Sequence, residues 1–261
     1  MDLNLKGKNA LVCGSSKGIG KACAIEIARL GANVTLVART GEKLAEVKKI
    51  LDNTMGQHHD FLVADFTDSA DLKRKVPGLL SVKNIHILVN NTGGPAGGPL
   101  PDAEEEEFVQ AFHNHLVCNH LLTKLVLKGM KAEGYGRIIN IISTSVKQPL
   151  ENLGVSNTVR GAVANWAKSL ANELGGFGFT VNNVLPGATL TERLTAIIQG
   201  KAQREDKSED EVMEEMKAEI PAGRFADPRE IAAAVAFLAS PAAAYINGIN
   251  VPVDGGRTKS L

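Results

Sequence analysis

The sequence predicts one α/β domain over residues 1–261, with a Rossmann-type, doubly wound parallel sheet of about seven strands. Short, continuously apolar runs alternate with segments of helical periodicity along the whole chain. Strands of this composition are buried on both faces, and helices must connect them when they run parallel. A hydrophobic content of 44% supports one large core, and neither a linker nor a repeat of fixed period interrupts the pattern.

The strand predictions rest on apolar runs of five or six residues. After the first run, residues 18–30 have helical periodicity, and Gly31 ends that helix because glycine readily adopts the left-handed conformation found there. A last strand leads to Asp254. The other predicted strands cover residues 9–13, 34–38, 60–64, 85–90, 137–142 and 180–185.

An acidic run marks the start of one helix. Asp102 precedes Glu105 by the spacing of a capping box, and Glu104, Glu106 and Glu107 fall in the same first turn. Carboxylates are favourable there because the helix dipole is positive at its N-terminus. We interpret the run as a solvated helix start; a metal site or an acidic interaction segment is the alternative.

Residues 188–221 form a polar, charged and helical insertion between a strand and the helix before the last strand. Ser208 and Glu211 form a capping box inside it, and Asp227-Pro228 opens the helix that follows. Such a segment suits a lid over a cleft, and an ordinary surface helix pair is the competing interpretation.

Composition excludes several function classes. Lys+Arg and Asp+Glu both number 29 and aromatic residues make up 4%, which argues against nucleic acid and anionic membranes as partners. No apolar run reaches the length of a membrane span, and no signal-peptide pattern opens the chain. Three cysteines without paired spacing, and histidines without H-E-x-x-H spacing, predict neither a metal site nor disulfides and fit a cytoplasmic protein.

A glycine-rich turn connects the first strand to the first helix. Its first glycine permits the tight turn, the second lets the backbone approach a pyrophosphate, and the third lets helix and strand pack closely. The helix N-terminus adds amides and partial positive charge, so the turn predicts a nucleotide site rather than a purely structural turn. The turn consists of Gly14, Ser15, Ser16, Lys17, Gly18, Ile19 and Gly20.

Four further segments follow the turn in a fixed order. They are Asp65, then Asn90-Asn91-Thr92-Gly93, then Pro186-Gly187 with Thr191, and finally Asp254-Gly255-Gly256. With the turn, they resemble the motifs of the short-chain dehydrogenase/reductase family, most closely its 3-oxoacyl-carrier-protein reductase type. The resemblance spans the whole chain, although Cys13 replaces a threonine and Thr92 an alanine.

The resemblance implies a set of cofactor contacts. Asp65 would hold the adenine amino group, Asn91 and Gly93 would line the nucleotide, and Thr191 would meet the nicotinamide carboxamide. The family also implies a homo-oligomer, a dimer or a tetramer, formed through the helices of residues 102–132 and 155–175.

The predicted cofactor is NADP (NADPH). NAD enzymes place an acidic residue at the end of the second strand to hold the ribose 2′-hydroxyl. Here Ala38 and Arg39 occupy that point, and Lys17 lies in the nearby turn. Two cations without a carboxylate suit a 2′-phosphate; the alternative is that both are ordinary surface cations.

The predicted reaction site departs from the family pattern. The family's catalytic set of asparagine, serine, tyrosine and lysine maps onto His115, Ser143, Ser156 and Arg160, so only the serine is retained. Neither Tyr135 nor Tyr245 is placed to replace the missing tyrosine.

The substituted residues still predict some chemistry. Ser143 can polarise a carbonyl, and Arg160 can bind the nicotinamide ribose and stabilise a developing alkoxide without giving up its proton. Ser156 lies one helical turn from Arg160 and could relay a proton. His115, with an unperturbed pKa of about 6.5, could supply one, or it could be a structural residue bonded to a backbone carbonyl.

We therefore expect an NADP-dependent oxidoreductase that acts on a small-molecule carbonyl or alcohol through an atypical Ser-x-x-x-Arg. The alternative is a catalytically inactive NADP(H)-binding sensor or assembly protein. Residues 93–99, a glycine- and proline-rich loop, would line the substrate cleft, and their lack of charge argues against a strongly anionic substrate there.

Overall fold

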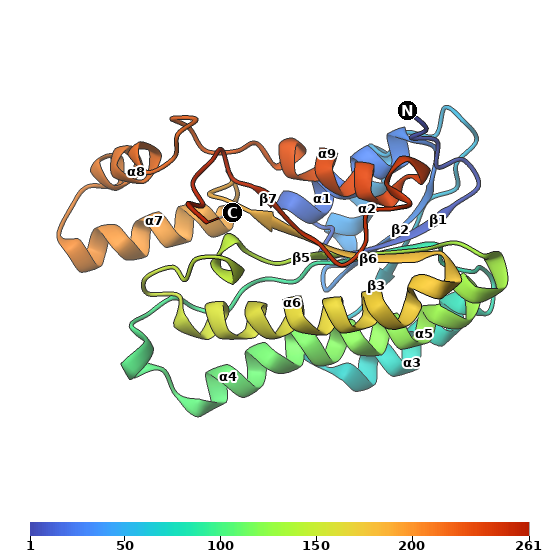
Figure 1. Ribbon diagram of the computed structural model, residues 1–261, viewed down its shortest axis with the longest axis horizontal. Coiled ribbons are helices and arrows are strands. Elements are labelled where there is room, and N and C mark those ends of the chain that lie inside the picture. The colour runs from blue at the N-terminus through green and yellow to red at the C-terminus, as the bar shows by residue number, and fades with distance from the viewer. Residues whose placement is uncertain (261) are drawn as a thin grey trace.

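The computed structural model describes residues 1–260 and contains the predicted fold, one α/β domain with a parallel sheet between two helical layers (Figure 1). Within these residues seven strands lie in the order β3-β2-β1-β4-β5-β6-β7. The predicted strand limits hold to within one or two residues. The strands are β1 (Asn9–Cys13), β2 (Asn33–Ala38), β3 (Asp60–Val63), β4 (Ile87–Asn90), β5 (Gly136–Ile141), β6 (Phe179–Pro186) and β7 (Asn250–Val253).

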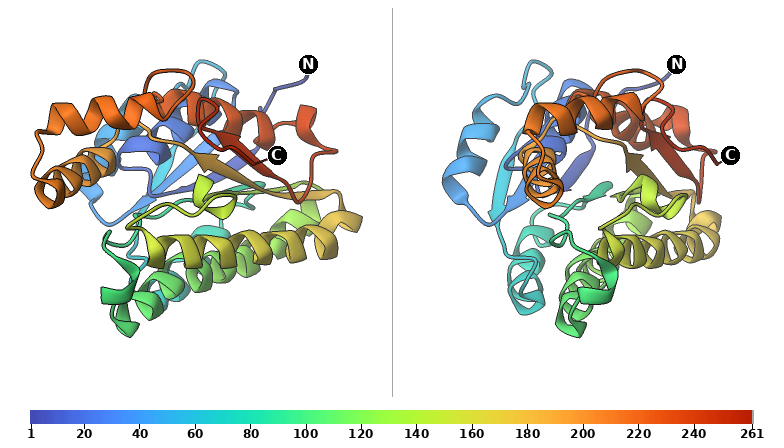
Figure 2. Two further views of the ribbon diagram at one scale, coloured as in Figure 1. Left: turned by 60° about the vertical axis from the view of Figure 1, so that its left-hand side comes forward. Right: turned by 90° about the vertical axis from the view of Figure 1, so that its left-hand side faces the viewer.

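Helices cover both faces of the sheet (Figures 1 and 2). Those above it in Figure 1 are α1 (Gly18–Arg29), α2 (Gly41–Lys49) and α9 (Pro228–Ala239). Those below it are α3 (Ser69–Leu80), α5 (Cys118–Glu133) and α6 (Gly154–Leu174). Among the described residues, no helix has the length and apolar character needed to cross a membrane.

The two layers explain why the strands are apolar at every position. Ala10 and Val12 of β1 join the core on the α1–α9 side, whereas Leu11 and Cys13 join the core on the α5–α6 side. Successive side chains of a strand point to opposite faces, so a sheet covered twice needs apolar residues at all of them.

The helix after the acidic run starts later than predicted. Asp102 ends a short 3₁₀ turn, Leu100–Asp102, and α4 (Glu105–Phe112) is capped by Glu104. The capping box forms between Glu104 and Glu107, where the Glu104 amide donates to Glu107 Oε2 at 3.1 Å. The acidic first turn is therefore as predicted, but the box is shifted by two residues.

The inserted segment folds into α7 (Glu192–Glu205) and α8 (Glu209–Ala218), which share a small apolar core of their own. Figure 1 shows this pair at the left-hand end of the molecule. The Ser208–Glu211 capping box at the start of α8 and the Asp227 cap of α9 form as predicted.

Replacing Gly20 by alanine should destabilise the fold. A Cβ at this position would press into the backbone oxygen of Gly14 and lie 2.7 Å from Asn91 Nδ2, both of which are fixed by the turn. We expect a loss of about 1–3 kcal/mol in the free energy of unfolding, measured by chemical denaturation.

Gly78→Ala provides the matched control. Gly78 lies in α3, and a Cβ there would meet nothing within 4 Å. Removal of a helix-interior glycine should leave stability unchanged or raise it by up to about 1 kcal/mol. Equal effects of the two substitutions would contradict the packing assigned to Gly20.

Candidate active site

A cleft of about 1650 Å³ opens at the carboxyl ends of the strands. In this fold class that edge carries the ligands. The cleft brings together all the predicted site residues except Gly20, which is buried beneath the turn, and His115. The predicted residues that line it are Gly14, Ser16, Lys17, Gly18, Ile19, Arg39, Asp65, Asn91, Gly93, Ser143, Ser156, Arg160 and Thr191.

The glycine turn is shaped for a close approach of backbone groups. Gly14 and Gly18 have φ values of +59° and +56°, and a Cβ on Gly14 would lie 2.5 Å from the carbonyl oxygen of Asn91. Asn91 in turn donates from Nδ2 to the Cys13 carbonyl oxygen at 3.3 Å. Lys17 is the N-cap of α1 but makes no side-chain cap, so the first-turn amides can serve an anion.

The two residues predicted to bind the 2′-phosphate, Arg39 and Lys17, differ in their surroundings. Arg39 follows β2 and is exposed in the cleft wall. Lys17 forms an ion pair with Glu192, the first residue of α7. This pair, which lies on the surface, lowers the pKa of Glu192 through the hydrogen bond from Lys17. Sequence spacing could not reveal a partner that lies so far along the chain.

Two polar residues of the cleft follow strands that lie far apart in the sheet, β3 and β5. Asp65 follows β3 and accepts a hydrogen bond from the Thr67 amide at 2.9 Å. Ser143 follows β5, and its Oγ accepts from the Ser145 amide at 3.1 Å. Because a hydroxyl can accept and donate together, the Ser143 proton remains available to a group in the cleft.

Arg160 lines the cleft beside the carboxyl end of β5. It is buried on α6, one turn after Ser156, and donates from Nη1 to the carbonyl oxygen of Ile141 at 2.8 Å. Burial, and secondly the charge of Arg193, lower the pKa of Arg160 to about 10. The guanidinium therefore remains charged at neutral pH.

His115 is not placed as a proton donor. It lies in a π-helical turn, His113–Val117, is 2% exposed, and its Nδ1 is 2.5 Å from Thr92 Oγ1. Burial, and secondly the charge of Arg160, lower the pKa of His115 to about 2. The pKa therefore lies far below the unperturbed value of about 6.5, and the imidazole is neutral near pH 7. Its partner is a hydroxyl rather than a backbone carbonyl.

Both tyrosines lie outside the cleft, as predicted. The hydroxyl of Tyr135 donates to the Ala239 carbonyl oxygen at 2.7 Å, at the amino end of β5. Tyr245 is fully exposed before β7. Neither lines the cleft that contains Ser143.

One charged residue of the site was missed by sequence reasoning. Arg193, in the first turn of α7, donates from Nη2 to the carbonyl oxygen of Pro95 at 2.6 Å. The glycine- and proline-rich loop is uncharged in sequence, but the fold brings a guanidinium against it. In the sequence, the only feature that places Arg193 near the site is its position two residues after Thr191.

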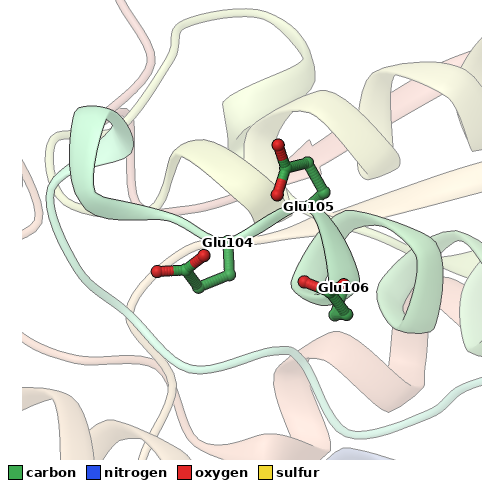
Figure 3. Close-up of side chains that lie close together, drawn as sticks. All are labelled: Glu104, Glu105 and Glu106. Atoms are coloured by element: carbon green, nitrogen blue, oxygen red, sulfur yellow. The ribbon is translucent and has the colours of Figure 1, made fainter.

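The acidic run at the start of α4 is exposed to solvent, as predicted. Glu104, Glu105 and Glu106 follow one another in the chain (Figure 3). One carboxylate oxygen from each lies within 4.8 Å of the other two. The Glu104 carboxylate is already used in capping α4. The run therefore acts as a helix start.

Comparison with known proteins agrees with this geometry. The family model described as enoyl-(acyl carrier protein) reductase matches residues 14–258. The chain is 37% identical to the 3-oxoacyl-(acyl-carrier-protein) reductase FabG of Vibrio cholerae serotype O1 over 257 residues, which cover 97% of this chain and 98% of the relative.

Solved structures give the same result. L-Sorbose reductase from Gluconobacter frateurii, complexed with NADPH and L-sorbose, has a TM-score of 0.92 and 30% identity, with 100% of both chains covered. An actinorhodin polyketide ketoreductase with NADPH has a TM-score of 0.90 and 30% identity, with 97% of this chain and 98% of that chain covered. The chain belongs to the short-chain dehydrogenase/reductase family.

Proposed function

We propose that this protein is an NADP(H)-dependent reductase of a small-molecule ketone, with Ser143 and Arg160 as the groups that polarise the carbonyl. One observation carries the proposal: a serine hydroxyl and a buried guanidinium lie in the same cleft as a glycine turn with uncapped helix amides. Relatives that are reductases solved with NADPH support it.

The cleft residues fit the cofactor in three places. The amides of α1 would hold the pyrophosphate, and Asp65 the adenine. Arg39 would bind the 2′-phosphate, and Lys17 would join it by leaving Glu192. Thr191, Asn91 and Gly93 would surround the nicotinamide, which supplies a hydride when bound.

The reaction then depends on electrostatics more than on an acid in the protein. Ser143 donates a hydrogen bond to the carbonyl oxygen, and the charge of Arg160 stabilises the alkoxide as it forms. One preorganised donor of this kind contributes about 10²–10³-fold to rate. Ser156 relays the proton from solvent or from a donor on the substrate itself.

His115 has a positioning role in this proposal. Its imidazole is neutral and holds Thr92, which follows β4 beside the nicotinamide site. In this proposal the proton therefore comes from solvent or from the substrate and not from His115. The reductase is favoured over the inactive sensor because the polarising groups and the glycine turn share one cleft.

We also propose that α7 and α8 act as a lid. The first turn of α7 contacts both walls of the cleft, through Glu192 to Lys17 and through Arg193 to Pro95. The exposed Lys17–Glu192 ion pair is of a weak kind, with a median contribution of about 0–1 kcal/mol, so it can break when ligands enter.

Replacing Arg39 by aspartate should reverse the cofactor preference. Loss of a charge-assisted phosphate contact should weaken NADPH binding by about tenfold or more, while NADH binding is kept or improved. Fluorescence titration measures both. Lys73→Asp, on the exposed face of α3, makes the same charge change outside the cleft and should alter neither. Equal affinity of the wild type for the two cofactors would refute the assignment of Arg39.

The double change Ser156→Tyr with Arg160→Lys should raise reductase activity toward activated ketones. It supplies an acid and a tuning cation, and general acid catalysis contributes about 10²–10⁴-fold. NADPH consumption is followed by absorbance. Ser156→Phe with Arg160→Lys fills the same volume without the hydroxyl and should give no gain. If the tyrosine variant binds NADPH yet gains nothing over the phenylalanine variant, the cleft is not built for this chemistry.

We propose a homo-oligomer, a dimer or tetramer, through α4, α5 and α6. On α4, the side chains of Val109 and Phe112 are 70% and 42% exposed, so an apolar face of this helix is uncovered in a single copy of the chain. Val109→Asp with Phe112→Asp should shift the molecule to a monomer in light scattering. Val82→Asp, equally apolar and exposed after α3, should not. A monomeric wild type at micromolar concentration would contradict the proposal.

A further inference from the structure

Two guanidinium groups of the cleft face the same small space. An ideal Cβ placed on Gly94 would lie 3.8 Å from Arg160 Nη2 and 3.8 Å from Arg193 Nη2. Arg160 comes from α6 and Arg193 from α7, so the fold, and not the sequence, brings these charges together. Their proximity also appears in the lowered pKa of Arg160, to which Arg193 contributes.

Both arginines are fixed by neutral partners and leave donors free. Arg160 donates to the carbonyl oxygen of Ile141, and Arg193 to that of Pro95. Within residues 1–260 neither forms an ion pair with a carboxylate. A guanidinium has five N–H donors, so each keeps several for a ligand in the cleft.

Two neighbouring cations without an anion are costly unless a ligand supplies one. The carboxylate next to Arg193 in the sequence does not neutralise it, because Glu192 pairs with Lys17 on the side of the glycine turn. Two consecutive residues of α7 thus serve different walls of the cleft. Glu192 contacts the cofactor turn, whereas Arg193 contacts the loop that follows β4.

We propose that the substrate is a small keto acid, with its carboxylate on Arg193 and its ketone oxygen between Arg160 and Ser143. This rests on the proposed reductase function and names its substrate class. It replaces the expectation, drawn from the uncharged loop, that an anionic substrate is disfavoured there. Arginine suits the task because its planar fork binds a carboxylate through two parallel hydrogen bonds.

The reaction follows from this placement. A hydride from the dihydronicotinamide of NADPH forms the new C–H bond at the ketone carbon, and the electron pair of the C=O π bond moves to oxygen. A proton from solvent, relayed by Ser156, completes the hydroxyl group. NADPH is oxidised to NADP⁺, the keto acid is reduced to a hydroxy acid, and the carboxylate is unchanged.

The anionic oxygens at Arg193 could instead belong to the cofactor pyrophosphate. The substrate is favoured because the uncapped amides of α1 would hold the pyrophosphate, and Arg193 lies against Pro95 in the loop proposed to line the substrate site. The two sources are separated by measuring cofactor and acid binding in the same variant.

The test uses the full chain saturated with NADP⁺ and titrated with 2-hydroxybutanoate, 3-hydroxybutanoate and their methyl esters, followed by ligand-observed NMR. We expect the wild type to bind at least one of the two acids. Arg193→Gln should lower the affinity for that acid by about tenfold or more. The neutral esters should not distinguish the two proteins, and Arg193→Lys should recover part of the acid affinity. NADPH affinity and the thermal midpoint should match wild type, which shows that the variant is folded.

Three results would overturn the proposal. The first is that the wild type binds neither acid. The second is that the wild type and Arg193→Gln both bind acids and esters with equal affinity. The third is that Arg193→Gln lowers the affinity for NADPH and not for the acid, which would assign the arginine to the pyrophosphate. A wild type that fails to bind NADPH at all would refute the reductase function itself, and this result is distinct from failure of acid binding in a competent NADP⁺ complex.

Discussion

Arg160 hydrogen-bonds through Nη1 to the carbonyl oxygen of Ile141, the last residue of β5, and it is 92% removed from solvent with no carboxylate beside it among the described residues. This placement determines the rest of the reaction side. The carbonyl fixes the guanidinium against the sheet, so its remaining donors face the cleft. A desolvated positive charge interacts strongly with nearby groups because the local dielectric constant is low.

The neighbours of Arg160 reflect that charge. His115 is held neutral, with a pKa lowered to about 2 by burial and then by Arg160. In the proposed function this site stabilises negative charge without an internal acid, since the hydroxyls that line the cleft belong to serine and threonine residues and both tyrosines lie elsewhere. Under the proposed function the same charge would favour an anion in the cleft, and Arg193, which lies near the same face of Gly94, would reinforce it.

The sequence was enough to predict the fold and most of the residues that line the cleft, because these depend on local signals. Alternation of apolar runs and helices predicts a doubly covered sheet, and the glycine turn predicts where a nucleotide would lie. The start of α4 was misplaced because several glutamates satisfy the same capping spacing. Arg193, the pKa of His115 and the Lys17–Glu192 pair were not predictable, because each depends on contacts between segments far apart in the chain.

A crystal structure of the protein with NADPH and a bound hydroxy or keto acid tests the central claim most directly. The account predicts the nicotinamide ribose and the reacting oxygen on Arg160, the 2′-phosphate on Arg39, and a carboxylate on Arg193 beside Gly94. A structure in which Arg160 turns away from the nicotinamide, or in which Arg193 holds the cofactor pyrophosphate, would contradict it.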